Sequence, residues 1–390
     1  MKIKLLPGKN DDLTVYIATL VLSAVSLVMV ASASVGIASQ QSDAVSYNMI
    51  RQVVYFLIGY ALMMFFYYNF SARLVRGLLP FVVVALTALL ILTLIYAPVN
   101  GAKAWLHFFG FSLQPSEFVK VYIILYLAIK LTRKAERNLD FWTTFKWPTI
   151  VLGLWFVIIA YLQSDLGTAI VIAMITAICL LVVPGKALRL VKLAIKLGFI
   201  AACLFVGFLA TATGVAFIEY LPIANYQKLR FIGFVNPFYE IDRGTYQLFQ
   251  SLRTFARGKF FGVGFGNSQQ KFGYLPEART DFILPIIIEE LGLFGLALVV
   301  LPYCAILYNI FHYAVKTEVR SEKVILVGTI AYLFVHFLLN VGGVSALIPM
   351  TGVPLLLISS GGSSTMSVML LLGICQNIIN KIRWEENASN

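Results

Sequence analysis

The sequence has few charged residues, few histidines and few cysteines. Only 12% of its 390 residues are charged, whereas a soluble domain contains about 25%. The 18 acidic residues are outnumbered by 30 basic ones, and the 3 histidines and 4 cysteines show neither metal-ligand spacing nor a disulfide pattern. These shortages argue against a separate soluble domain and against a zinc-type metal site.

Apolar residues dominate the chain. They make up 60% of it, with a mean hydropathy of +0.86, and they form runs of about 17 to 25 residues, the length that crosses a hydrocarbon core. The sequence therefore predicts an all-α polytopic membrane protein, with a single membrane domain over residues 1–390. About ten transmembrane helices are expected, near residues 13–35, 50–69, 77–97, 114–131, 147–162, 166–184, 197–218, 282–309, 324–341 and 354–379.

The first apolar run also has features of a secretory signal. Lys2 and Lys4 precede it, and Ala31-Ser32-Ala33 is similar to a cleavage site. The apolar core of a signal is about 7 to 15 residues long. This run is longer and many spans follow it, so we expect an uncleaved first helix.

Basic residues fall in alternate short connections between the predicted spans. By the positive-inside rule, such connections are cytoplasmic, which places both termini in the cytoplasm. The formal charge of +12 then reflects membrane topology and not nucleic-acid binding. The residues concerned are Arg73, Arg76, Arg133, Lys134, Arg137, Lys146, Lys186, Arg189, Lys192, Lys316, Arg320, Lys323, Lys381 and Arg383.

One long extracytoplasmic connection, residues 219–281 between the seventh and eighth spans, is also basic. Its length exempts it from the positive-inside rule, so the charge favours either adhesion to anionic lipid headgroups or capture of a phosphate-bearing substrate. Within it, Tyr246–Phe260 has the period of an amphipathic interfacial helix, with Arg253 and Arg257 on one face. The cations are Lys228, Arg230, Arg243, Arg253, Arg257, Lys259, Lys271 and Arg279.

Three carboxylates begin spans that start at the outer surface: Glu117, Asp165 and Asp281. Carboxylates are favoured at helix N-termini, where they offset the helix dipole, and this is the simplest explanation for the first two. Glu117 can also pair with Lys120. Asp281 is the better functional candidate because it joins the basic connection to a helix that carries further carboxylates. Helical geometry puts Glu289 nearer to its side than Glu290.

Two glycine-rich runs have structural interpretations. Gly262–Asn267 has neither the strand nor the helix that a dinucleotide site requires, so it predicts a tight turn. Ile358–Thr365 interrupts the start of the last predicted span and predicts close packing or a broken helix beside a cavity.

Several of these motifs occur together in one order, and the set resembles the family of shape, elongation, division and sporulation (SEDS) proteins. The resemblance covers nearly the whole chain, and details such as Gly266–Lys271 and Tyr274–Ala278 are more similar to the division member than to the elongation member. The matching pieces are Asn100-Gly-Ala-Lys-Ala-Trp105, Gln114-Pro-Ser-Glu-Phe-Val-Lys120, Gln163-Ser-Asp-Leu-Gly-Thr168, Gly244-Thr-Tyr-Gln247, Gly264-Phe-Gly-Asn-Ser268, Leu275-Pro-Glu-Ala-Arg-Thr-Asp-Phe282, Glu289-Glu-Leu-Gly292, Asn340-Val-Gly-Gly343, Pro349 to Pro354 and Ser360-Gly-Gly-Ser-Ser364.

The resemblance implies a peptidoglycan glycosyltransferase that polymerises lipid II at the outer face of the cytoplasmic membrane during septal wall synthesis. It implies inverting transfer from a glycan on undecaprenyl pyrophosphate, and it makes Asp281 the essential aspartate. The partners it implies are a class B penicillin-binding protein, other division proteins and membrane lipids, with no nucleic acid. Expected substrate-binding residues are Trp105, Lys103, Glu117, Lys120, Arg243, Arg253, Arg257, Lys259, Lys271, Arg279, Glu289 and Ser363.

The chain departs from the family pattern at four positions: Ala104, Ser164, Arg279 and Ser359 stand where arginine, proline, histidine and tyrosine are usual. Lys103 can replace the missing arginine. No departure affects Asp281.

The role of Asp281 has two alternatives. It can act as the base that deprotonates the sugar hydroxyl, or it can hold a divalent cation, Mg²⁺ or Mn²⁺, against the pyrophosphate; no organic cofactor is expected. A helix N-terminus and Arg279 would lower its basicity, whereas burial would raise it. The alternative functions are a lipid II flippase, the elongation polymerase and a non-catalytic scaffold.

Overall fold

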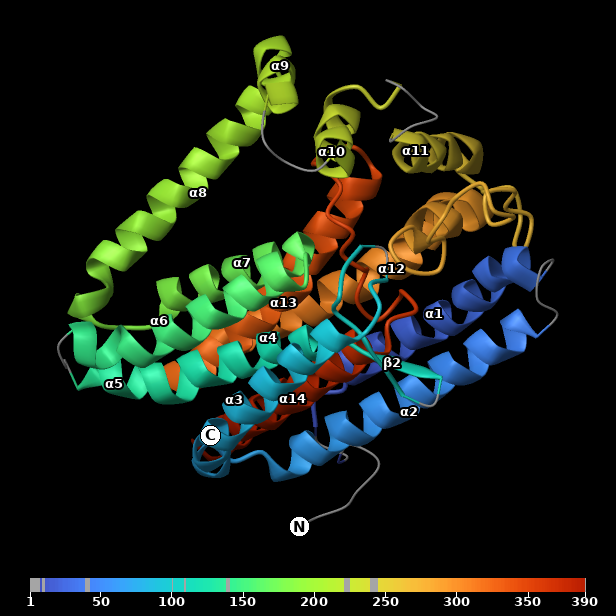
Figure 1. Cartoon of the computed structure of the whole chain (residues 1–390). Helices are drawn as coiled ribbons and strands as arrows, with labels where there is room; N and C mark the ends of the chain where they lie inside the picture. The colour runs from blue at the N-terminus through green and yellow to red at the C-terminus, as the bar shows by residue number, and fades with distance from the viewer. Residues whose placement is uncertain are drawn as a thin grey trace.

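The computed structural model describes residues 8, 11–38, 43–99, 101–108, 110–137, 141–220, 225–238 and 245–389 as a bundle of helices (Figure 1). Within these residues, eight helical segments are long and apolar enough to cross a membrane, and α7 is a shorter apolar helix. This confirms the predicted polytopic all-α fold. The long elements are α1 (Thr14–Ala38), α2 (Ala44–Asn69), α3 (Ala72–Leu92), α6 (Phe141–Val157), α7 (Leu166–Val182), α8 (Arg189–Leu209), α12 (Ile283–Lys316), α13 (Arg320–Val344) and α14 (Gly362–Ser389).

The predicted span at 114–131 consists of three consecutive pieces, α4 (Pro115–Tyr126), η2 (Leu127–Leu131) and α5 (Thr132–Glu136). The middle piece is one π-helical turn. Short turns extend two other helices, η1 (Thr93–Ile95) after α3 and η3 (Ile158–Leu162) after α6, and η4 (Lys186–Leu188) precedes α8. Two short antiparallel strands, β1 (Leu106–Phe108) and β2 (Phe111–Leu113), form a hairpin that was not predicted.

Two predicted span boundaries are wrong. The predicted span at 197–218 is divided, because α8 ends at Leu209 and α9 (Ala212–Tyr220) begins after a break. The Thr211 hydroxyl accepts a 3.1 Å hydrogen bond from the backbone N–H of Gly214 and so caps the new helix. The last span begins at Gly362 and not at residue 354, since 350–361 is an apolar but non-helical loop.

The centre of the bundle is formed by α1, α2, α12, α13 and α14, with close packing of α14 against α2 and of α1 against α12. Gly59 and Gly373 lie where α2 and α14 touch, and a Cβ at Gly373 would collide with the backbone of Met63. Small residues at such points let membrane helices approach closely. In contrast, α8 stands apart from the bundle (Figure 1), and no residue in its most apolar stretch is buried.

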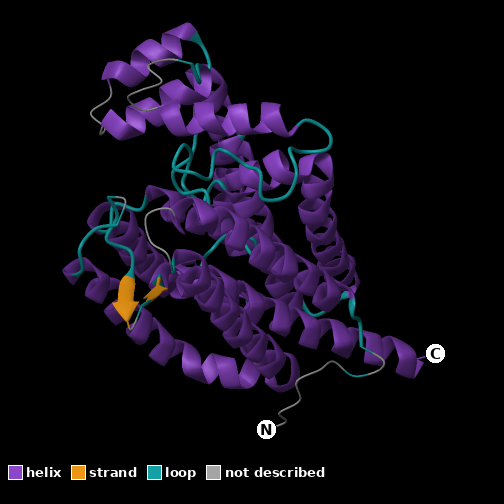
Figure 2. Cartoon of the chain, turned by 90° about the vertical axis from the view of Figure 1, so that its right-hand side faces the viewer, coloured by secondary structure: helices purple, strands orange, loops and turns teal. Residues whose placement is uncertain are grey.

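Both ends of the described chain lie at the same end of the bundle (Figure 2). An ion pair joins Asp12 to Arg383 at 3.8 Å, and another joins Lys381 to Glu322 at 2.7 Å. This end carries the alternate basic connections and is therefore cytoplasmic by the positive-inside rule. The opposite, outer end carries α9, α10 (Asn225–Val235) and α11 (Tyr246–Gly258).

The predicted amphipathic helix is confirmed as α11, and the glycine run after it forms the predicted turns. Gly262, Gly264 and Gly266 all have positive φ angles. These turns pack against a break in α12, where Gly292 has φ 61° and ψ −146°. The N–H of Val263 donates to the Glu289 carbonyl at 2.8 Å, so a carbonyl released by the broken helix finds a partner inside the protein, as irregular backbone at membrane depth requires.

Candidate active site

Asp281 lies immediately before α12, in a segment whose backbone is held by the loop that precedes α14. The carbonyl groups of residues 279–281 each accept one hydrogen bond, two from that loop and one from α13. The donors are the N–H of Ser360 at 2.9 Å, the hydroxyl of Ser359 at 2.6 Å and the side-chain amide of Asn340 at 2.8 Å. Three consecutive anchors fix the position from which the Asp281 side chain projects.

The partly exposed Asp281 carboxylate faces a small hollow with about 10 Å³ of free volume, room for roughly one water molecule. Gly352 approaches it closely: a Cβ there would lie 3.5 Å from the Asp281 Oδ2 and 3.7 Å from Nη2 of Arg230 on α10. The lining also includes Asn340 and Thr351, whose Oδ1 and Oγ1 atoms are buried and make no hydrogen bond to the described residues. The hollow thus presents oxygen atoms to whatever enters it.

The electrostatic surroundings make Asp281 an unusually basic carboxylate. Its pKa is raised to about 7: burial is the largest cause, the Glu277 and Asp165 carboxylates act in the same direction, and the Arg230 guanidinium opposes them. Of the two opposing effects expected on the pKa of Asp281, burial therefore outweighs the nearby cation. The opposing cation is Arg230, and not Arg279 as the sequence suggested.

Two guanidinium groups lie close enough beside this segment to influence each other. Burial lowers the pKa of Arg279, and the charge of Arg51 on α2 lowers it as well. Arg51 also lies 5.9 Å and 5.7 Å from the ring centres of Tyr47 and Tyr55. Neighbouring cations of this kind are suited to a multiply charged anion such as a pyrophosphate.

The predicted pair of Glu117 and Lys120 forms a 2.7 Å ion pair that is almost completely buried, with exposed fractions of 2% and 1%. The Lys120 ammonium also contacts Nε2 of His336 at 2.9 Å, and Tyr332 donates to Glu117. Because Nε2 faces an ammonium, the ring proton belongs on Nδ1, which lies 3.2 Å from the Pro354 carbonyl. The pair therefore supports the loop that carries Gly352 and does not line an open cavity, which differs from our expectation.

Asp165 has the helix-capping role that its position predicts. Its Oδ1 accepts a 3.0 Å hydrogen bond from the N–H of Thr168, and its Oδ2 accepts one from the Gln114 side chain at 3.0 Å. Ser363 fixes the same region, since its hydroxyl accepts from the Gln114 N–H at 2.8 Å. These contacts join the outer starts of α4, α7 and α14.

The other predicted substrate residues are distributed more widely. Lys103 is exposed and Trp105 is half-buried beside the β-hairpin, while Arg253 and Lys259 are exposed at α11. Arg243 lies outside the described residues.

Lys271 and Arg257 belong to a separate set of contacts around the broken part of α12. Lys271 is buried, and its ammonium donates to Ser32 at 3.0 Å, to the Gly266 carbonyl at 2.7 Å and to Glu290 at 2.9 Å. Arg257 lies 3.4 Å from Glu289. The glutamates thus hold the outer loop, and none of the described contacts brings Glu289 to the hollow beside Asp281.

Sequence reasoning did not single out Arg230, Arg51 or Glu277 for the site. Arg51 carries a usable signal, because it is a lone arginine at the outer start of a span. Arg230 appears only as one of eight cations in the long connection, and Glu277 adopts a positive φ of 57° that no motif indicated.

The side chains around the hollow have a limited capacity to bind a divalent cation. In the described part of the chain, no group of three or more His, Cys, Asp or Glu side chains could hold a metal. The oxygen atoms of Asp281, Asn340 and Thr351 are nonetheless the donor type that Mg²⁺ prefers, and Mg²⁺ is commonly held by one carboxylate together with substrate phosphates. The residues fit an ion shared with the substrate.

Comparison with known proteins gives a consistent result. A family model described as a cell cycle protein family, covering FtsW, RodA and SpoVE, matches residues 12–383. The probable peptidoglycan glycosyltransferase FtsW of Bacillus subtilis is 32% identical over 97% of this chain and 93% of that protein. Stage V sporulation protein E of the same organism is also 32% identical, over 96% of this chain and 98% of that protein.

Two solved structures share this fold. A chain from a study of how a peptidoglycan synthase complex coordinates polymerization and crosslinking superposes with a TM-score of 0.72 at 23% identity, covering 96% of this chain and 99% of that one. The rod shape determining protein RodA of Thermus thermophilus superposes with a TM-score of 0.61 at 20% identity, covering 96% and 98%.

Proposed function

This chain belongs to the FtsW, RodA and SpoVE family, and we propose that it polymerises lipid II into peptidoglycan glycan strands at the outer face of the membrane. The observation that carries the mechanism is Asp281: a carboxylate with a pKa of about 7 at the outer end of the bundle, on a backbone anchored at three successive carbonyls. A carboxylate that titrates near neutral pH is suited to general base catalysis.

In this mechanism the 4-hydroxyl of the acceptor sugar attacks the anomeric carbon of the donor glycan. A bond forms between the hydroxyl oxygen and that carbon, while the bond from the carbon to the pyrophosphate oxygen breaks on the opposite side. Asp281 removes the hydroxyl proton, and the pyrophosphate leaves with the bonding electron pair. Attack opposite to the leaving group inverts the anomeric configuration.

The leaving group develops negative charge, which Arg51, Arg279 and Arg230 are placed to stabilise. Preorganised cations at a partly dehydrated site are worth more than the same cations in water. Arg51 and Arg279 influence each other's charge, and Arg230 shares the surroundings of Gly352 with Asp281. Two of these three residues come from outside the α12 segment, so the site is assembled only in the folded bundle.

A divalent cation would be held by Asp281 together with Asn340 Oδ1 and Thr351 Oγ1. When bound, it would supply additional positive charge to the pyrophosphate oxygens. The chain's own arginines orient the same group without it. Base and metal-ligand roles for Asp281 predict different pH and metal dependence, which the experiment below separates.

The division role, a septal location and a partner follow from the relatives and not from the site. FtsW proteins from Bacillus subtilis and Lactococcus lactis are both 32% identical to the chain, which supports a division polymerase. The structural neighbour from a peptidoglycan synthase complex supports assembly with a crosslinking enzyme, for which a class B penicillin-binding protein is the candidate. Other division proteins remain proposed partners.

The test uses the purified full chain with fluorescent lipid II, with and without a class B transpeptidase, across pH 5.5–8.5 and with a series of divalent ions. We expect glycan ladders. On the acidic limb of the profile of yield against pH, the yield should rise through about pH 7. Translocation of the lipid across liposome membranes without formation of glycan ladders would instead indicate a flippase. The absence of both activities would indicate a non-catalytic scaffold.

The metal series distinguishes the two roles of Asp281. If ladders form in the presence of a chelator and their yield still falls on the acidic side of pH 7, the result supports Asp281 as the general base. Ladders that require Mg²⁺ or Mn²⁺ and show no limb near pH 7 support the metal ligand.

A further inference from the structure

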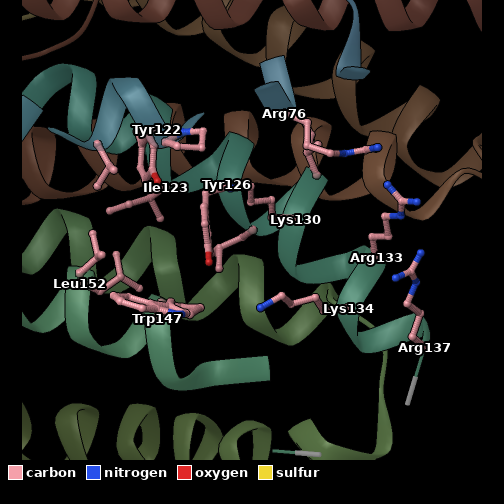
Figure 3. Close-up of a pocket in the computed structure, with 16 residues that line it drawn as sticks. Arg76, Tyr122, Ile123, Tyr126, Lys130, Arg133, Lys134, Arg137, Trp147 and Leu152 are labelled. Atoms are coloured by element: carbon pink, nitrogen blue, oxygen red, sulfur yellow. The ribbon is translucent and has the colours of Figure 1, made fainter. Parts of the chain in front are cut away.

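A cleft of about 550 Å³ opens at the cytoplasmic end of the bundle, opposite the end that carries Asp281 (Figure 3). Its walls come from α3, from α4 with η2 and α5, and from α6. The proposed polymerisation uses none of its residues. The lining residues that the argument uses are Arg76, Tyr126, Lys130, Arg133, Lys134, Arg137 and Trp147.

The lining changes from basic to apolar with depth on two of the three walls, and the third wall, α6, contributes no charged residue. Along α4 and η2, Arg133 and Lys130 lie at the cytoplasmic end, and Tyr126 and Tyr122 follow toward the membrane centre. At 1.5 Å per residue, Arg133 and Tyr122 are separated by about 16 Å, roughly half of a hydrocarbon core. The cleft therefore has the polarity profile of one leaflet.

The α3 wall repeats this order, and the α6 wall is aromatic and apolar. On α3, Arg76 precedes Pro80 and Val83, and on α6, Trp147 precedes Leu152. In Figure 3, Arg76, Arg133 and Arg137 gather at one end of the cleft, and Trp147 and Leu152 lie at the other. Trp147 is 63% exposed, as is common for a tryptophan at a membrane interface.

The charge of the cleft is of one sign, since five cations and no acid line it. The Nε of Arg76 is buried and has no hydrogen-bond partner among the described residues. The Lys134 ammonium donates a 3.3 Å hydrogen bond to the Thr143 carbonyl. Cationic groups without carboxylate partners are suited to an anionic headgroup.

The backbone that builds the cleft is irregular where the cations begin. One π-helical turn, Leu127–Leu131, interrupts the helix that carries Lys130, and π-turns of this kind are often found at functional sites. Pro80 in α3 and Pro148 in α6 also line the cleft, within their helices. The positive-inside rule accounts for basic residues near helix ends, but not for their convergence on an aromatic cleft across three helices.

We propose that this cleft binds an anionic phospholipid of the cytoplasmic leaflet. The phosphate lies among Arg76, Lys130, Arg133, Lys134 and Arg137, and the acyl chains extend along the apolar walls toward Tyr122 and Leu152. Charge complementarity and the matched depth profile select this occupant. A soluble phosphate would leave the apolar part unused, and a zwitterionic lipid would leave the cations unpaired.

The test measures quenching of Trp147 fluorescence by brominated phosphatidylglycerol in nanodiscs that hold the full-length protein. Trp147→Phe identifies the signal of this tryptophan among the five in the chain. We expect saturable quenching by phosphatidylglycerol that exceeds quenching by brominated phosphatidylcholine at equal content. Arg133→Gln, Lys134→Gln and Arg137→Gln combined should weaken it by about a hundredfold, since each basic residue near an anionic lipid contributes roughly fivefold.

A matched variant removes the same charge elsewhere on the cytoplasmic face: Arg73→Gln, Lys146→Gln and Lys186→Gln, all at exposed residues outside the cleft lining. It should change the affinity less than about twofold. A second variant, Leu152→Phe, fills the apolar part without changing charge or adding a tryptophan signal, and it should also weaken binding.

Three results would overturn the proposal. They are equal quenching by the two lipids, equal loss in the matched variant, and displacement of the lipid by millimolar inorganic phosphate. The last would show that the headgroup charge alone is recognised. Thermal unfolding of each variant identifies any that fails to fold, and for these Leu152→Phe supplies the independent measurement.

Discussion

Asp281 and Glu290 belong to one segment and carry the same chemical group, yet the fold treats them differently. Glu290 is fully buried and meets Lys271 at 2.9 Å, Ser32 at 2.8 Å and the N–H of Ser268 at 3.3 Å. Asp281 has its backbone held, but its carboxylate faces a hollow where two other carboxylates oppose its ionisation and one arginine favours it. Pairing, and not burial alone, separates a structural carboxylate from a reactive one.

The difference has an energetic basis. A buried charge with a partner and hydrogen bonds is tolerated, and removal of one partner leaves the other uncompensated. A carboxylate whose ionised form is destabilised keeps its affinity for a proton, which general base catalysis needs. The outer end of the bundle therefore contains both a structural carboxylate, Glu290, and a reactive one, Asp281.

The largest expected effect is that of Asp281→Asn on activity. Loss of the base should reduce lipid II polymerisation by about a hundredfold or more, measured as glycan ladder yield. Folding should not suffer. The folded-state pKa of about 7 lies above the ordinary value of 3.8, so ionisation destabilises the fold. That cost is absent below the ordinary pKa, grows as pH rises, and is fully present above pH 7.

Asp281→Asn should therefore raise Tm at pH 8 and change it less at pH 5. A lower Tm at pH 8 would contradict the conclusion that ionisation of Asp281 destabilises the fold. Polymerisation that survives the substitution would remove both the base and the metal-ligand roles.

The second effect concerns stability. Glu290→Gln leaves the Lys271 ammonium buried without its anionic partner, and breaking such a pair costs about 3 to 5 kcal/mol. We expect a large fall in Tm at neutral pH. The double variant Glu290→Gln with Lys271→Met removes both charges and should recover much of the loss. If Glu290→Gln keeps its Tm but loses activity, Glu290 takes part in catalysis and does not mainly stabilise the fold.

Much of the fold could be predicted from the sequence because apolar length alone defines a membrane span. The boundaries that failed are those where hydropathy carries no information. Residues 355–358 are apolar and buried, but Leu357 has a φ of 64° and the segment is a loop. At the break after α8, Thr211 caps the next helix, and one threonine in a largely apolar run does not mark a helix end in a hydropathy profile.

The candidate site could be predicted only in part, for a related reason. Asp281 was found because a carboxylate at a helix start beside a basic segment is rare and costly. Its cationic neighbour Arg230 was not, because the placement of α10 depends on long-range packing. Lys271 was expected at the substrate, and the sequence could not show that Glu290 and Ser32 would enclose it.

The third prediction concerns Arg230→Gln. The guanidinium lowers the pKa of Asp281, so its removal should raise that pKa and move the acidic limb of the activity profile to higher pH by about half a unit to one unit. Activity at pH 7 should fall a few-fold and recover at pH 8.5. Arg253→Gln, at an exposed position on α11, is the matched control and should leave the limb in place. A pH-independent rise in KM would assign Arg230 to the pyrophosphate instead.

The smallest effect is expected for Ser359→Ala, which tests the backbone anchors beneath Asp281. The Ser359 hydroxyl donates to the Thr280 carbonyl at 2.6 Å and accepts from the Leu355 N–H at 2.9 Å. Loss of the donated bond should cost about 1 kcal/mol and lower kcat a few-fold by loosening the position of Asp281, with the acidic limb unchanged. Ser345→Ala removes a hydroxyl that bonds only to carbonyls within its own helix end, so its kcat should equal that of the unaltered protein. Equal effects of the two substitutions would mean that the anchors do not position the carboxylate.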